Sequence, residues 1–438
     1  MVVCAAQFVV VLDATIVTTA MPSIQAALGF TPAGLAWVIT AYTLVLGALL
    51  IIGGNVADLV GPRRAFAVGL LVFAAGSAVC GSAWAPGVLV AGRVVQGLGA
   101  ALLSPAALVQ LTALSEPGPD RRRAVGWWTA AAAGGGASGW VLGGLFTEFL
   151  GWRTVFWVNL PIAVLALIAA ARWLPPGERR RGTRPDWTGA LAVTATLALL
   201  VYGLSENRLA LAPALIAAVL LGRHLRRSAE PLLPPTLLRS RPAAGANLTA
   251  LLLTATTTPA MYLSTLYAQQ VLSLSPARAS LLFPAFNAGV IAGSLGGPAV
   301  LRRIGARRTL LGGFAAIGVG AVVFATLPAQ GRPIVQLLTA FVVLGGGLGA
   351  ASVASTQVGT EAAEAEHRGV AAGVLNSSAQ IGTSLGLAII VPLAGTVRTG
   401  FLSTGVVAAA GLAAALLVPA APARDRAGHR SISLPSRD

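Results

Sequence analysis

Residues 53–64 read GGNVADLVGPRR, and residues 297–308 read GPAVLRRIGARR. Both segments follow a long apolar run, end in Gly-x-Arg-Arg and precede another apolar run. Glycine permits a tight reversal between two helices, and an arginine pair anchors such a loop at an anionic membrane surface. The matching positions indicate two duplicated helical halves; a chance match of common residues is the alternative. Duplicated helical halves are typical of transporters that hold their substrate between the halves, near the middle of the bilayer.

The composition places the chain in a membrane. Of 438 residues, 56% are hydrophobic and only 10% are charged, and the mean hydropathy is +0.80. Soluble globular chains carry about 25% charged residues, so this chain cannot hide its apolar surface in a soluble core. The net charge of +16 is dispersed in short clusters between apolar runs, and no nucleic-acid partner is therefore expected.

The remaining reactive residue types give no catalytic or metal site. The sequence has no lysine, which excludes a Walker-type phosphate loop. Cys4 and Cys80 lie inside apolar runs, and the three histidines lie in polar connectors without a second ligand at metal spacing. We find no nucleophile–base set in or near the apolar runs. The sequence therefore predicts neither an enzyme nor a bound cofactor.

Fourteen apolar stretches are candidates for membrane spans, because a helix needs about 20 apolar residues to cross a bilayer. The weakest pair is 188–204 and 209–222, for which a single re-entrant hairpin is the alternative. The predicted spans are 2–23, 34–56, 65–84, 87–113, 124–147, 153–173, 188–204, 209–222, 245–270, 279–299, 309–327, 333–357, 369–393 and 401–420.

The arginines predict the orientation. With the amino terminus in the cytoplasm, twenty-four of the 30 arginines fall in cytoplasmic connectors and five in outer connectors, while Arg93 lies within a span. This distribution follows the positive-inside rule. It also favours an even number of spans, because the removal of one span would reverse the sorting after it. We therefore expect a multi-pass protein of the cell membrane with both termini in the cytoplasm.

The first repeat resembles the loop motif of the major facilitator superfamily, Gly-x-x-x-Asp-x-x-Gly-x-(Arg/Lys)-(Arg/Lys). It departs from that motif at Leu59, where the pattern has a basic residue. The resemblance extends over essentially the whole chain and is to the 14-helix drug:proton antiporter branch. The residues that match the loop motif are Gly54, Asp58, Gly61, Arg63 and Arg64.

This resemblance implies an all-α integral membrane fold of two six-helix bundles with two additional central helices. The additional helices would be the pair within 188–222. The predicted segments are a first bundle at 1–174, cytoplasmic loops with the two additional helices at 175–241, a second bundle at 242–420 and a cytoplasmic tail at 421–438.

Asp13 is the acid that we place deep in a span, about 18 Å from its start at 1.5 Å per residue. A carboxylate at that depth costs about 2.5–3.5 kcal/mol, and such residues commonly face the bundle interior and serve a function. The stretch LDAT at 12–15, with Met21 and Pro22 after it, resembles the first-helix signature of the branch. We predict that Asp13 takes up and releases a proton; a neutral carboxyl that only binds neighbouring helices is the alternative.

Arg93 is the basic residue within a span, in the stretch GRVVQGLGAA at 92–101. This stretch is similar to the fourth-helix motif of the superfamily, which is implicated in proton transfer. An unpaired cation in lipid is costly, so we expect Arg93 to bind Asp13 directly or through water. The alternative is an arginine that reaches out to the membrane surface.

The fifth predicted span carries Gly135, Gly139 and Gly143 at spacings of four. Such a glycine face lets another helix approach closely. The stretch GWVLGG, from Gly139 to Gly144, resembles the antiporter motif Gly-Pro-x-x-Gly-Gly, with Trp140 in place of the proline. The resemblance gives this face a part in antiport, while close packing alone is the alternative reading.

Other polar and aromatic residues within the spans are candidates for a substrate cavity. Each of them could instead form a hydrogen bond between helices. These candidates are Trp37, Tyr42, Gln96, Tyr262, Tyr267, Asn287, Asn376 and Gln380.

Together these features predict a proton-driven exporter of amphipathic small molecules, such as drugs or antibiotics, that works by alternating access. The expected partners are a small-molecule substrate, protons and membrane lipids, and we expect a functional monomer. Import of a metabolite on the same fold and a non-transporting sensor are the alternatives. The glycine face and the additional helices favour export, and a single deep carboxylate favours neutral, singly charged or zwitterionic substrates over dications.

Overall fold

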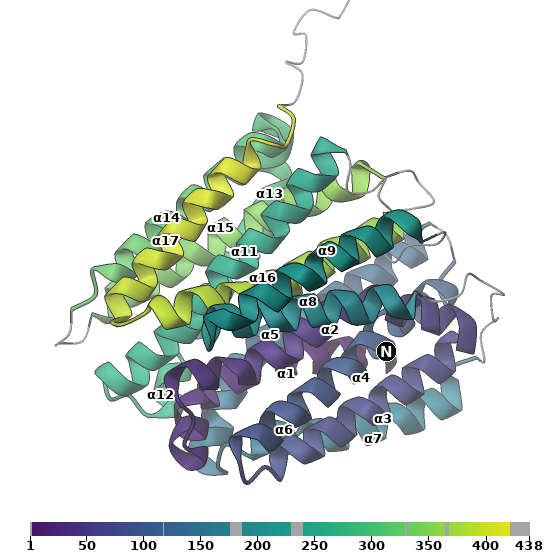
Figure 1. Ribbon diagram of the computed structural model, residues 1–438, viewed down its shortest axis with the longest axis horizontal. Coiled ribbons are helices and arrows are strands. Elements are labelled where there is room, and N and C mark those ends of the chain that lie inside the picture. Colours follow the sequence, from purple (N-terminus) through teal and green to yellow (C-terminus); the bar gives the residue numbers. More distant parts are fainter. Residues whose placement is uncertain are drawn as a thin grey trace, which may run out of the picture.

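Helices make up nearly all of the part of the chain that the computed structural model describes. That part comprises residues 2–116, 118–175, 186–228, 240–328, 331, 333–363 and 368–420, and it contains no strand. The helices form two bundles of long rods, with the first half of the chain in one and the second half in the other (Figure 1). The predicted tail at 421–438 lies outside the described residues.

Four helices of the first bundle, α2 to α5, begin at proline. Proline suits the first helical turn because the amide donor that it lacks would have no helical partner there. Thr31 caps α2 by accepting a hydrogen bond from the amide of Gly34 at 3.0 Å. The helices are α1 (Val2–Leu28), α2 (Pro32–Val60), α3 (Pro62–Gly81), α4 (Pro86–Ala113), α5 (Pro119–Phe149), α6 (Thr154–Trp157) and α7 (Asn159–Trp173).

The second bundle repeats this plan. Gly61 separates α2 from α3 with a φ of 93°, and Gly305 separates two helices of the second bundle with a φ of 82°. Positive φ is cheap only for glycine, so the two Gly-x-Arg-Arg segments occupy equivalent turns. The helices are α11 (Arg241–Leu266), η2 (Tyr267–Val271), α12 (Pro276–Ser280), α13 (Phe283–Ile304), α14 (Ala306–Ala325), α15 (Ile334–Glu361), α16 (Arg368–Leu393) and α17 (Val397–Ala415).

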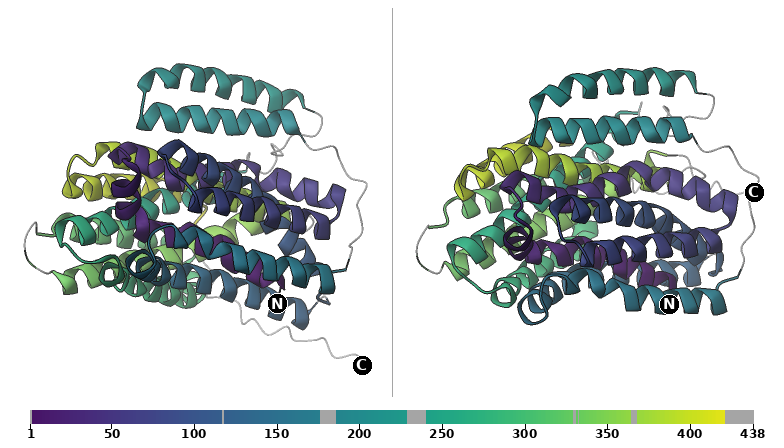
Figure 2. Two further views of the ribbon diagram at one scale, coloured as in Figure 1. Left: turned by 90° about the horizontal axis from the view of Figure 1, so that it is seen from below. Right: turned by 60° about the horizontal axis from the view of Figure 1, so that its bottom comes forward.

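A two-helix hairpin lies outside both bundles, on one side of the molecule (Figure 2). It consists of α8 (Trp187–Ser205), η1 (Arg208–Ala210) and α9 (Leu211–Arg227). Helix α8 packs against α2 of the first bundle and α16 of the second, while α9 packs against α8 and leaves most of its side chains exposed. The two ends of the hairpin meet where His224 Nε2 lies 2.8 Å from Oδ1 of Asp186.

All fourteen predicted spans coincide with helical segments of the described chain. Twelve helical segments are long and apolar enough to cross a membrane by length and composition, and α8 and the segment Arg208–Arg227 are among them. Helices α5 and α11 are also long, at 31 and 26 residues, but fall outside this set. The protein is therefore a multi-pass membrane protein with at least twelve candidate spans.

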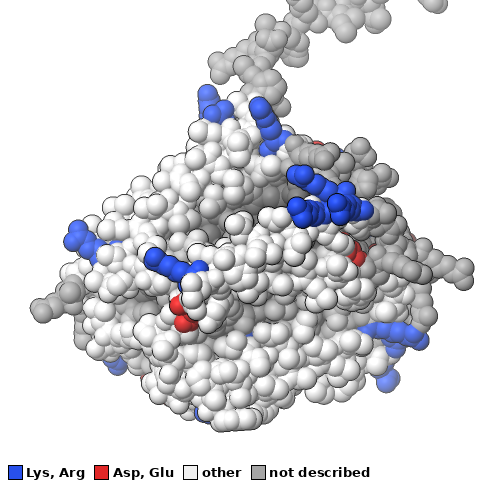
Figure 3. Space-filling model, viewed as in Figure 1, with Lys and Arg blue, Asp and Glu red and all other residues white. Residues whose placement is uncertain are grey.

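The charges separate the two ends of the bundles. The turns that contain Gly61 and Gly305 lie at one end, which we call the arginine-rich end; the turns at Gly29 and Gly151 lie at the other, the arginine-poor end. The middle of the face in Figure 3 carries few charged side chains, as expected for a surface in lipid.

Close helix packing within the first bundle depends on glycines. A methyl group at Gly53 of α2 would overlap the carbonyl oxygen of Ala101 in α4, whereas one at Gly54 would lie 3.8 Å from Cβ of Pro105, an ordinary contact. Adjacent glycines on one helix therefore differ sharply in how closely a neighbouring backbone approaches them.

We expect Gly53→Ala to destabilise the folded protein by about 1–3 kcal/mol, because a filled interface must shift to admit the methyl group. The measurement is the thermal unfolding midpoint of the purified protein in detergent. Gly54→Ala is the matched control and should unfold near the wild-type midpoint. Equal midpoints for the two variants would refute this account of the α2–α4 contact.

Candidate functional site

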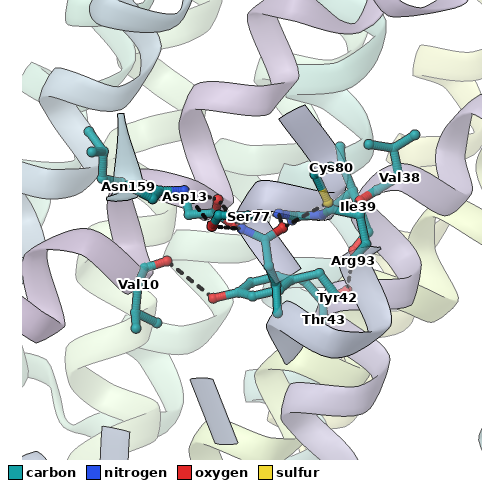
Figure 4. A network of polar contacts seen from close by, with 12 residues as sticks. Val10, Asp13, Val38, Ile39, Tyr42, Thr43, Ser77, Cys80, Arg93 and Asn159 are labelled. Carbon is teal, nitrogen blue, oxygen red and sulfur yellow. Dashed lines mark hydrogen bonds and ion pairs between the residues drawn. The ribbon is translucent and has the colours of Figure 1, made fainter. Parts of the chain in front are cut away.

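Asp13 and Arg93 lie at the centre of a polar cluster inside the first bundle, and both side chains are fully buried at 0% exposure. Asp13 comes from the middle of α1 and Arg93 from the second turn of α4. Nη1 of Arg93 lies 2.5 Å from Oδ2 of Asp13. The sequence left a direct or a water-mediated contact open, and the structure shows a direct ion pair (Figure 4).

The carboxylate of Asp13 accepts hydrogen bonds from three side chains. Its Oδ1 accepts from Nε2 of Gln96 at 2.9 Å and from Nδ2 of Asn159 at 2.7 Å, while Oδ2 accepts from Arg93. Gln96 comes from α4 and Asn159 from the start of α7. Three donors from α4 and α7 therefore converge on one buried carboxylate.

The guanidinium of Arg93 is held by neutral groups as well. Its Nε donates to the carbonyl oxygen of Val38 at 2.7 Å, and Nη1 also donates to Oε1 of Gln96 at 2.9 Å. The guanidinium carbon lies 4.3 Å from the ring centroid of Tyr42, a cation–π contact. Its Nη2 is buried without a hydrogen-bond partner among the described residues. The cation is thus fixed in place but not fully satisfied.

A further layer links the pair to α3. Oγ of Ser77 accepts from Gln96 at 2.7 Å and from Asn159 at 3.3 Å, and Sγ of Cys80 donates to Oε1 of Gln96 at 3.3 Å. The sequence pointed to neither Ser77 nor Asn159. Their one signal was an uncharged polar residue within an apolar run, which is too common in membrane helices to single out a site.

The glycine face of α5 contacts two different partners. Methyl groups at Gly135, Gly139 and Gly143 would overlap α1 atoms of Phe8, Thr15 and Ile16 respectively, which is packing within the first bundle. A methyl group at Gly144 would overlap Ser280 of α12. Gly144 is thus the member of the face that lies between the bundles.

Trp140 joins the two bundles. Its side chain, 7% exposed, stacks on Phe283 of α13 with ring centroids 4.5 Å apart and an angle of 11° between the planes. The ring centroid of Phe283 in turn lies 5.3 Å from that of Phe341 in α15. Helix α5 runs without interruption through this position. The aromatic ring that replaces the motif proline therefore anchors the first bundle on the aromatic core of the second.

Hydrogen bonds between the bundles lie in the same half of the molecule as the stack of Trp140 on Phe283. Hydroxyls of Thr43 and Ser384 lie 2.8 Å apart, Gln269 donates to the carbonyl oxygen of Thr19 at 2.8 Å, and a carboxylate oxygen of Glu148 accepts from the amide of Ala277 at 2.8 Å. Each of these partners lies nearer the arginine-poor end of its helix. The two bundles are therefore in contact at the arginine-poor end.

The loop motif surrounds the turn between α2 and α3. Nη2 of Arg63 donates to the carbonyl oxygen of Ala171 at 2.5 Å, which ties the turn to the end of α7, and Arg64 is exposed. Asp58 is half-buried and makes no ion pair with a described residue. Gly61 supplies the left-handed turn.

The eight candidate cavity residues do not converge on one site. Tyr42 and Gln96 belong to the polar cluster, and the ring centroid of Trp37 lies 6.5 Å from that of Tyr202 in α8. In the second bundle, Tyr262 is buried, Tyr267 donates to the carbonyl oxygen of Pro328, and the buried amide nitrogen of Asn287 has no hydrogen-bond partner among the described residues. Gln380 lies at the interface between the bundles, beside Gly47 of α2.

Asn376 alone of the eight lines a cavity of about 240 Å³ in the second bundle. Helices α11, α15 and α16 form its walls, and it lies toward the arginine-rich end of all three. Among the residues that the structure describes, no group of three His, Cys, Asp or Glu side chains could hold a metal ion.

Comparisons with known proteins agree with this architecture. A profile of the Major Facilitator Superfamily matches residues 3–387. Over 414 residues the chain is 37% identical to the cephamycin export protein CmcT of Amycolatopsis lactamdurans, covering 91% of this chain and 85% of that protein. It is 36% identical over 414 residues to the puromycin resistance protein pur8 of Streptomyces alboniger, covering 91% and 81% respectively.

Solved structures share the fold at much lower sequence identity. A POT family transporter crystallised with 5-aminolevulinic acid matches with a TM-score of 0.74 and 13% identity, covering 95% of this chain and 94% of that chain. The nucleoside transporter NupG matches with a TM-score of 0.70 and 13% identity, covering 95% and 98%. At such identities the likeness concerns the fold alone.

We expect Trp140→Ala to weaken the closure at the arginine-poor end, because an aromatic pair contributes about 0.5–1.5 kcal/mol beyond the area that it buries. Spin labels at Trp84→Cys and Val335→Cys, exposed positions in different bundles, report that closure by double electron–electron resonance. The variant should shift the distance distribution toward longer separations.

Trp127→Ala is the matched control for this measurement, since Trp127 lies on the same helix but is 60% exposed. It should leave the distance distribution unchanged. A Trp140→Ala distribution equal to that of the wild type would show that the stack does not hold the bundles together.

Proposed function

The chain belongs to the major facilitator superfamily and is a membrane transporter rather than an enzyme, and we propose that it exports antibiotics or related amphipathic small molecules in exchange for protons. Two relatives that align over about nine tenths of this chain are named for cephamycin export and puromycin resistance. A third, the lincomycin resistance protein of Streptomyces lincolnensis, is 32% identical over 438 residues, covering 96% of this chain and 90% of that protein. These names support efflux over import.

The observation that carries the proton coupling is the buried pair of Asp13 and Arg93. It is the one ion pair that the described residues form within the bundles, and it has no exposed atom. Removing one partner of a buried pair costs about 3–5 kcal/mol, because the other charge is left uncompensated. Protonation of Asp13 would leave Arg93 in that position, so proton uptake forces the cluster to rearrange.

That rearrangement would act on whole helices. The pair and its direct partners come from α1, α2, α4 and α7, and Ser77 of α3 accepts hydrogen bonds from two of those partners, Gln96 and Asn159. A change in the charge of Asp13 therefore alters contacts among five helices of the first bundle at once. A proton that crosses the membrane supplies about 2.3 kcal/mol per 100 mV and about 1.4 kcal/mol per pH unit, comparable to the cost of a rearranged pair.

The conformation fits the stage at which an exporter takes up substrate. The positive-inside rule places the arginine-rich end in the cytoplasm, and with it both termini, the predicted tail at 421–438 included. The contacts between the bundles then lie on the outer side, where Trp140 and Gly144 meet the second bundle. The cavity in the second bundle lies toward the arginine-rich end, which would face the cytoplasm in this orientation.

We further propose the finer topology that the sequence suggested. The chain has fourteen spans, with the α8–α9 hairpin as two additional helices between bundles at 1–174 and 242–420. It works as a monomer in contact with membrane lipids. The loop motif from Gly54 to Arg64 would guide the movement of α2 and α3, because Arg63 ties their turn to α7.

We expect the double variant Asp13→Asn/Arg93→Gln to abolish substrate accumulation driven by a pH gradient, since it removes both charges and keeps groups that can bond each other. The double variant avoids the unpaired arginine that Asp13→Asn alone would leave in the bundle. The measurement is uptake into inverted membrane vesicles that are acidified inside, at equal amounts of folded protein.

Exchange of labelled for unlabelled substrate without a gradient should survive in the double variant, because exchange needs the rocking movement but no net proton flow. Glu206→Gln, at an exposed turn of the hairpin, is the control and should keep both activities. Undiminished gradient-driven uptake in the double variant would rule out this pair as the proton coupler.

A further inference from the structure

The cavity of about 240 Å³ in the second bundle is a candidate binding site that the ion-pair cluster does not explain. All of its lining residues come from α11, α15 and α16, so it is complete within one bundle. Sites for drug-sized ligands commonly occupy about 300–1,000 Å³. This cavity therefore suits one part of such a molecule, about the size of a single substituted ring.

The cavity offers hydrogen-bonding groups that are free for a ligand. Ser352 and Thr356 lie four residues apart on α15, so both face the cavity one helical turn apart. Asn376 faces it from α16. The side chains of these three residues form no hydrogen bond with a described residue. Thr254 and Ser355, which also line the cavity, already bind other protein atoms.

None of the residues that line the cavity is ionisable. The carboxylate deep in the first bundle is not available to a ligand either, because Asp13 is fully buried and accepts from three donors. A cation in the cavity would therefore meet no opposite charge among the lining residues. Hydroxyl, amide and carbonyl groups can be satisfied there by the two hydroxyls and the amide.

We infer that this cavity is a subsite for the uncharged, hydrogen-bonding part of the substrate, held by Ser352, Thr356 and Asn376. The inference rests on the proposed export function and narrows its substrate class. The carrier takes solutes that are uncharged where they enter the second bundle, and it reserves its membrane carboxylate for the proton. Substrate selection and proton coupling then use separate bundles and do not compete for one acid.

Equilibrium binding to the purified carrier tests the subsite without any gradient. The probes are chloramphenicol, which is uncharged and carries hydroxyl and amide groups, and ethidium, which is a permanent cation. We expect the wild type to bind chloramphenicol, and Asn376→Ala and Thr356→Ala each to weaken that binding about fivefold, as the loss of one hydrogen bond predicts. Gln357→Ala, next to Thr356 but outside the cavity lining, should bind as the wild type does.

Charge selection is tested by adding an acid. Ethidium should bind the wild type at least about tenfold more weakly than chloramphenicol does, and Asn376→Asp should strengthen ethidium binding by about tenfold, since it places an opposite charge beside the cation. The inference is overturned if the wild type does not bind chloramphenicol, if Asn376→Ala binds it unchanged, or if ethidium binds the wild type equally well.

Proton-driven uptake into inverted vesicles, measured in parallel, separates this inference from the proposed function. Binding that depends on Asn376 without any gradient-driven uptake would leave the subsite standing and reject the antiporter. Gradient-driven uptake that is indifferent to Asn376 and Thr356 would reject the subsite and keep the antiporter.

Discussion

A carboxylate and a guanidinium that are both removed from water must neutralise each other, and this constraint shapes the first bundle. Asp13 and Arg93 meet where α1 and α4 cross, and Gln96, Asn159 and the carbonyl oxygen of Val38 form further hydrogen bonds with them. Because a buried pair is costly to break, the helices that carry these partners have little freedom to move separately. The pair and its partners thus tie α1, α2, α4 and α7 together around one buried carboxylate.

The two bundles share a plan but differ in chemistry. The first bundle has a buried ion pair at its centre, whereas the second has hydroxyl and amide groups around a cavity. The second bundle also has an aromatic core, formed by Phe283, Phe324, Phe341 and Phe401. Trp140 extends that aromatic core across the interface. A contact that is mainly dispersive and hydrophobic can separate and reform without leaving a charge uncompensated, which suits an interface that must open in every cycle.

The sequence predicted the helices and the ion pair because lipid makes both requirements severe. A span needs a long apolar run, and a charge within it is rare enough to be noticed, so Asp13 and Arg93 stood out. Ser77 and Asn159 did not, since uncharged polar groups are common in such helices. Tyr42 and Gln96 are candidates for a cavity or for hydrogen bonds between helices, and in the structure they take part in the polar cluster. The stack of Trp140 on Phe283 joins residues far apart in the chain, which no local pattern reveals.

The α8–α9 hairpin makes the two seams between the bundles unequal. It covers the seam where α2 meets α16, and it leaves the seam where α5 meets α12 and α13 uncovered. Lipid tails, and any oily solute dissolved among them, therefore approach the covered seam only past two extra helices. A molecule that enters the interior sideways from the bilayer has its direct route on the α5 side. The hairpin therefore makes access from the membrane asymmetric.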